Sequence, residues 1–145
     1  MALEGIGAEI ESTVREVLAS IPQDRYMLQV EPATTEHGVI VQVRGAGNNK
    51  CPIDVIEEDD ALVILEVGRG AVEELRGNLD PLLEDLRYWL KQVIGGNIRE
   101  QVRLSSDGVV VKSDLHAGSG SGSQHLVTRK SGKWTSTIDY QYEAY

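Results

Sequence analysis

The chain has 145 residues, of which 41% are hydrophobic, 26% are charged and 5% are aromatic. This length fits one domain of ordinary size, and the hydrophobic share excludes wholesale disorder. No apolar run reaches the ~18 residues that a membrane-spanning helix needs. The first residues also lack the basic and apolar regions of a secretory signal. We therefore expect a single cytoplasmic domain over residues 1–145.

The net charge of −9 is concentrated in the first half of the chain. Residues 1–72 hold 13 acidic and 5 basic side chains, whereas residues 73–145 hold 10 acidic and 9 basic ones. An acidic surface repels nucleic-acid phosphates and anionic lipids, so we expect neither nucleic acid nor a membrane as a partner. It favours a basic protein partner, although improved solubility alone is the simpler explanation.

The spacing of apolar residues predicts helices and strands in a regular order. A helix is expected over about residues 4–20, where apolar side chains recur every three or four positions. Four short strands rich in β-branched residues should follow, at 25–31, 38–44, 51–57 and 61–67. A short helix is then expected before Gly77-Asn78, and a longer one over residues 81–94 that Asp80 caps. Four further strands are expected at 97–104, 108–115, 123–129 and 133–143.

The two halves of the chain share this order of elements. Residues 1–68 and 69–145 match at offsets of about 70 to 73 positions; for example, Gln29-Val30 falls opposite Gln101-Val102. We interpret this as a pseudo-repeat in an α+β domain, with two helix-plus-four-stranded antiparallel units sharing one core. Chance similarity of a common order is the alternative. Whether the strands form one sheet of eight or two smaller sheets stays open.

Residues that commonly carry catalysis or bind metals are few. Neither Cys51 nor the histidines His37, His116 and His125 show the close ligand pairs of structural zinc sites. Cys51 also has no histidine paired with it by local pattern, so a packed cysteine is expected. The Gly/Ser-rich loop 117–123 has the composition of a flexible linker and lies between two strands, which argues against a nucleophilic serine. We expect no catalytic residue, no metal and no cofactor.

Two surfaces are candidates for partner binding. The acidic run Glu57, Glu58, Asp59 and Asp60 is interpreted as a hairpin loop, either a solvated turn or a contact for a basic partner. The last strand places Trp134, Tyr140 and Tyr142 on one face, and at a sheet edge it would suit pairing with another chain. The basic residues beside Trp134 are a weak case for single-stranded nucleic acid in so acidic a chain; they are Arg129, Lys130 and Lys133.

These features favour a non-catalytic acidic protein-binding module. In size, acidity and helix-plus-antiparallel-sheet layout the chain resembles small bacterial secretion chaperones and toxin-immunity proteins, with no shared motif. That resemblance implies a role in holding or neutralising a protein partner. One alternative is a small-molecule-binding domain or enzyme with a pocket between helix and sheet. Another is a structural homodimer built on the final strand.

Overall fold

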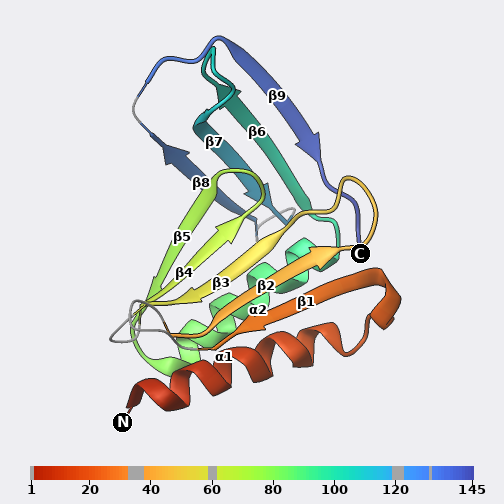
Figure 1. Cartoon of the computed structure of the whole chain (residues 1–145), viewed down its shortest axis with the longest axis vertical. Coiled ribbons are helices and arrows are strands. Elements are labelled where there is room, and N and C mark those ends of the chain that lie inside the picture. The colour runs from red at the N-terminus through yellow and green to blue at the C-terminus, as the bar shows by residue number, and fades with distance from the viewer. Residues whose placement is uncertain (1, 33–37, 59–61, 119–122, 131) are drawn as a thin grey trace.

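The computed structural model describes residues 2–32, 38–58, 62–118, 123–130 and 132–145. This part of the chain is an α+β fold with two helices and two antiparallel sheets (Figure 1). The helices are α1 (Ala2–Leu18) and α2 (Leu79–Ile94), and a short 3₁₀ turn, η1 (Gln23–Arg25), follows α1. The first sheet has the order β1-β2-β3-β4-β5, with β1 (Tyr26–Glu31), β2 (Ile40–Gly45), β3 (Ile53–Glu57), β4 (Leu62–Val67) and β5 (Ala71–Arg76). The second has the order β8-β7-β6-β9, with β6 (Ile98–Leu104), β7 (Val110–Ala117), β8 (Gln124–Arg129) and β9 (Ser136–Gln141).

β5 is a strand where the apolar spacing predicts a short helix. Residues 71–76 pair along their whole length with β4 in the antiparallel register. Gly68 adopts a φ of +71°, which allows the tight turn that reverses the chain between the two strands. A helix of six residues has few internal hydrogen bonds, so pairing with β4 is favoured. The first half therefore has five strands rather than four, and the expected boundary between residues 68 and 69 lies inside this turn.

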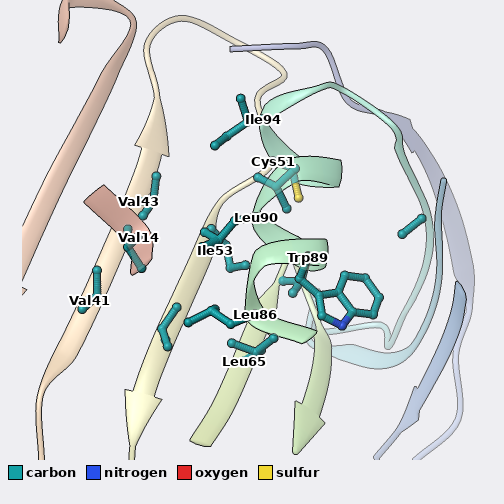
Figure 2. Close-up of a cluster of buried hydrophobic side chains, with 14 of the residues drawn as sticks. Val14, Val41, Val43, Cys51, Ile53, Leu65, Leu86, Trp89, Leu90 and Ile94 are labelled. Atoms are coloured by element: carbon teal, nitrogen blue, oxygen red, sulfur yellow. The ribbon is translucent and has the colours of Figure 1, made fainter. Parts of the chain in front are cut away.

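Both helices pack apolar side chains into one buried cluster. The predicted stripe of α1 is confirmed, because Ile10, Val14 and Leu18 are at most 1% exposed. α2 begins at Leu79, slightly before the predicted residue 81, with Asn78 rather than Asp80 at its N-cap. Figure 2 shows side chains of α1, α2 and the first sheet meeting in the cluster, which also includes residues of the second sheet. Its fully buried members include Val41, Val43, Ile53, Leu65, Leu86, Leu90, Ile98 and Leu115.

The second sheet differs from the first in the place of its last strand. β6, β7 and β8 form a meander, and β9 returns to pair with the other side of β6. β9 therefore lies at an edge of the second sheet, the position in which it would suit pairing with another chain. In the first sheet the fourth strand pairs with the third, so the two halves differ here, and their relation as copies stays a prediction. Ala117 ends β7 in the core, and residues 119–122 of the expected flexible loop lie outside the described residues.

A buried carboxylate joins the two sheets. Glu100 on β6 is 2% exposed. Its carboxylate accepts hydrogen bonds from the backbone N–H groups of Arg69 and Gly70 in the β4–β5 turn, at 2.8 and 3.0 Å. The hydroxyls of Ser113 and Tyr142 also donate to it, at 2.6 and 2.8 Å. These four donors replace the water that burial removes from the carboxylate.

No helix in the described ranges has both the length and the apolar character needed to cross a membrane.

Candidate functional site

The first residue of the acidic run, Glu57, does not lie in the exposed loop that the composition predicts. Glu57 is the last residue of β3 and is 5% exposed, so the expectation of a solvated side chain there is wrong. It faces inward like Ile53 and Val55, and its Oε1 accepts a hydrogen bond from the Val39 N–H at 3.0 Å. This hydrogen bond offsets part of the cost of burying a charge. Glu58 is half-buried, and Asp59 and Asp60 lie outside the described residues.

The three aromatic candidates of the last strand have different surroundings. Trp134 is 39% exposed and lies in the segment before β9. Tyr140 and Tyr142 stack on each other with ring centres 5.8 Å apart. Tyr142 is 2% exposed, because its hydroxyl binds Glu100 in the interior. Among the three, Trp134 and the half-buried Tyr140 are therefore placed to meet a partner.

Among the described residues, the two histidines and the cysteine are not assembled into a common site. His116 on β7 and His125 on β8 stack with ring centres 4.0 Å apart, whereas His37 lies outside the described residues. Cys51 is fully buried, and burial, followed by the nearby charge of Glu100, raises the pKa of its thiol well above the ordinary value. A neutral, buried thiol is a poor nucleophile. Across the described residues, no three His, Cys, Asp or Glu side chains are grouped so as to hold a metal ion.

The structure instead brings acidic side chains together between a helix and a sheet. A hollow of about 670 Å³ lies where α2 faces β5 at the edge of the first sheet. Four of its lining side chains are carboxylates and one is a guanidinium, so the lining carries a net charge of −3. We call it the acidic hollow; its lining residues are Glu73, Glu74, Leu75, Arg76, Glu84, Asp85, Tyr88, Trp89 and Gln124.

Glu73 is the most buried of the four acidic residues in the acidic hollow. Alternation along β5 puts it on the same side as the buried Ala71 and Leu75, and it is half-buried. Partial burial raises the pKa of its carboxyl, and the charges of Asp85 and Glu74 raise it further. A hydrogen bond from the Glu74 backbone acts in the opposite direction. The shift shows that the negative charge of Glu73 is incompletely compensated in the folded chain.

Two aromatic rings of α2 border the carboxylates. Tyr88 and Trp89 meet edge to face with ring centres 5.7 Å apart. Partial burial raises the pKa of the Tyr88 hydroxyl, which donates a hydrogen bond to the Ala117 carbonyl at 3.3 Å. Figure 2 shows Trp89 on a different side of α2 from Leu86, which lies near Leu65 of the first sheet. Carboxylates beside aromatic rings suit an organic cation, because both attract positive charge.

Comparison with protein-family models, curated proteins and solved structures finds no match to this chain.

Sequence patterns alone did not point to the acidic hollow. Glu73 and Glu74 fall in the segment for which a helix is expected, and Glu84 and Asp85 are typical of the solvated face of an amphipathic helix. The signal that was available is Glu73 itself, an acidic residue at an apolar position of the alternating pattern Ala71, Glu73, Leu75. An ionisable side chain at such a position is a common mark of a functional site.

Proposed function

We propose that this protein is a non-catalytic binding module that holds a basic protein partner through the acidic hollow. The observation that carries the proposal is that four acidic residues, from β5 and α2, line one hollow. Arg76 is the one cation of the lining, and it lies 3.2 Å from Glu74. A lysine or arginine side chain of a partner would offset the remaining charge.

An organic cation suits the acidic hollow better than a metal ion does. Ca²⁺ takes six to eight oxygen ligands at ~2.3–2.6 Å, which requires carboxylates gathered closely around one point. The described side chains show no such grouping. A lysine or guanidinium group can reach individual carboxylates separately and can also lie against an aromatic ring.

A protein partner is favoured by the charge outside the hollow. The chain carries a net charge of −9, most of it in the first half that forms the first sheet. A charge of this size accelerates the approach of a large basic molecule and is felt beyond the hollow itself. Glu84 and Asp85 are exposed, so an approaching surface can reach them directly.

The proposal agrees with the resemblance in size, acidity and layout to bacterial secretion chaperones and toxin-immunity proteins, which is a likeness of general form. The proposed setting is the cytoplasm, where a single unbridged cysteine stays reduced. The pseudo-repeat belongs to the same proposal. It is supported by the shared order of a helix followed by a three-stranded meander, α1 with β1-β2-β3 and α2 with β6-β7-β8.

The test uses an octalysine peptide as the basic probe and compares two charge-matched double variants. Glu73→Gln with Asp85→Asn reduces the net charge of the acidic hollow from −3 to −1, and Glu9→Gln with Asp24→Asn removes the same charge at exposed positions elsewhere. We expect the first double variant to weaken binding and to reduce its dependence on salt concentration, measured by isothermal titration calorimetry. Equal losses in both variants would show that the probe senses only the overall charge, and would refute the proposal.

The same titration distinguishes a protein partner from the small-molecule alternative. Spermidine and argininamide are compared with the peptide at equal charge concentration, again on the wild type and the two double variants. If either small cation binds as tightly as the peptide, the result would favour a small-molecule site between helix and sheet. Tighter binding of the peptide supports a protein partner, because a longer chain also meets the exposed carboxylates around the hollow.

Self-association through β9 is a second candidate, because β9 is an edge strand of the second sheet. Its residues 136–139 are exposed, and an exposed edge can pair with another strand. Light scattering of the full chain tests this candidate. A mass of twice 15.9 kDa for the wild type, and a single-chain mass for Asp139→Pro, would support the homodimer. A single-chain mass at high concentration would exclude it.

A further inference from the structure

The outer face of the second sheet carries a row of positive charges, opposite in sign to the acidic hollow. The strand register places Arg103 of β6 opposite Lys112 of β7, and Lys112 opposite Arg129 of β8. Adjacent strands are ~4.8 Å apart, so these three cations are direct neighbours. Like charges at directly opposite positions destabilise a sheet. Within the described residues, one carboxylate lies at ion-pair distance from this cationic row, that of Asp114 at 3.6 Å from Lys112 Nζ.

Trp134 covers the cationic row. The guanidinium of Arg103 is 4.7 Å from the centre of its ring system, and that of Arg129 is 5.8 Å away. Arg103 and Arg129 lie on the strands on either side of β7, so the indole bridges the row above Lys112. The side chain of Lys112, between these two strands, is 17% exposed although it points away from the core. The indole remains 39% exposed and forms an aromatic wall beside the three charges.

The neighbouring row of residues on the same face of the sheet is acidic rather than basic. There the register places Gln101 between Asp139 on β9 and Asp114 on β7, so two carboxylates border the cationic row. Gln101 donates to Asp139 at 3.0 Å, and Asp114 also lies 3.4 Å from His125. A long polyanion would have to cross these carboxylates and approach a chain with a net charge of −9. A compact anion held at Arg103, Lys112 and Arg129 does not have to cross these carboxylates.

The cationic row borders a hollow of about 600 Å³ on this face. Arg99, Arg103 and Lys112 line it together with Asp114 and Asp139, and Arg129 and Trp134 lie beside it. Ligand sites for small molecules commonly have volumes of about 300–1,000 Å³. Guanidinium groups bind phosphate through paired hydrogen bonds, and an indole can stack on a base. We propose that Arg103, Lys112, Arg129 and Trp134 form a binding site for a compact polyphosphate-bearing small molecule of nucleotide size. This site lies on the second sheet and shares no residue with the acidic hollow.

Inorganic triphosphate and ATP are the probes, titrated into the full chain at low salt without added metal. Binding is measured by isothermal titration calorimetry and by quenching of tryptophan fluorescence. Lys112→Gln and Arg103→Gln should each weaken triphosphate binding about tenfold or more, as expected for the loss of a hydrogen bond to a charged group. Lys91→Gln, on an exposed position of α2, is the matched control and should leave binding unchanged. Circular dichroism verifies the fold of each variant, and Arg129→Gln replaces any variant that fails to fold.

The outcomes separate the parts of the proposal. Tighter binding of ATP than of triphosphate, lost in Trp134→Phe, would support stacking of the base on the indole, and equal affinities would overturn that part. Absence of binding by both probes would overturn the proposal, as would an equal loss of affinity in Lys91→Gln. Tighter binding of an eight-residue oligothymidylate than of ATP would replace the compact anion with single-stranded nucleic acid.

Discussion

The hydroxyl of Tyr142 donates a hydrogen bond of 2.8 Å to Oε1 of Glu100, and each side chain is 2% exposed. Tyr142→Phe would leave the buried carboxylate with one donor fewer and no water to replace it. Hydrogen bonds to charged groups contribute about 1.5–3 kcal/mol to stability, so we expect a loss of this size in urea denaturation. Tyr140→Phe, on the ring stacked against Tyr142, is the control. Similar small losses in both variants would contradict the role given to this hydrogen bond.

Three buried acidic groups should make the protein sensitive to alkaline pH. Burial is the main cause that raises the pKa of the hydroxyls of Tyr142 and Tyr145 and of the Cys51 thiol above their ordinary values. Those values are about 10 and 8.5 in an unfolded chain, so above them the unfolded state binds fewer protons than the folded one. Stability should change little between pH 7 and about pH 8.5 and should fall above that value. Urea midpoints from pH 7 to pH 11 measure this, and Cys51→Ala should remove the fall between pH 8.5 and 10.

Alanine substitutions at Gly68 and Gly47 distinguish the stability cost of backbone strain from the cost of displacing Glu100. Both have positive φ, +71° and +94°. A Cβ at Gly68 would overlap the carboxylate of Glu100, whereas one at Gly47 would meet nothing within 4 Å. We expect Gly47→Ala to cost about 1–2 kcal/mol from φ alone, and Gly68→Ala to cost about 1–3 kcal/mol more. Thermal unfolding of both variants tests this, and equal losses would show that Glu100 moves aside without cost.

Glu73→Gln should stabilise the folded chain at neutral pH. The pKa of Glu73 is raised in the folded state, so its stabilising contribution is present below the unfolded value of about 4.3 and is lost as the pH rises. Glutamine removes that loss, with a gain below about 1 kcal/mol because solvent screens a half-exposed group. Melting temperatures at pH 3.5 and pH 7 measure the difference. Glu9→Gln should show no such pH dependence, and a destabilised Glu73→Gln at pH 7 would contradict the expectation.

Local apolar patterns were sufficient to predict both helices and eight of the nine strands in the described chain. The exception shows what local patterns lack. Val72, Leu75 and Leu79 are spaced like a helix face, yet Val72 and Leu79 are each 37% exposed. The pattern that holds is the alternation of Ala71, Glu73 and Leu75, in which a carboxylate interrupts the apolar series. Pairing with β4 decides the conformation, and that pairing depends on the turn after Gly68.

The candidate sites were less predictable than the fold, because each depends on residues that are distant in the chain. The acidic hollow joins Glu73 of β5 to Asp85 of α2 only if residues 71–76 form a strand. A run of four acidic residues at Glu57 predicted a solvated loop, although Glu57 continues the inward alternation of β3. The cationic row on the second sheet needs the register of three strands, which no single-sequence pattern supplies.

Glu100 has a consequence for how the chain unfolds. Its donors come from Arg69, 31 residues earlier, and from Tyr142, 42 residues later, so all of them are in place only when both sheets are docked. Melting of either sheet would remove donors of Glu100 together with the apolar contacts that both sheets make in the shared core. Such half-melted forms should stay sparsely populated. Calorimetric and van't Hoff enthalpies should therefore agree, as for a single all-or-none transition spanning both sheets.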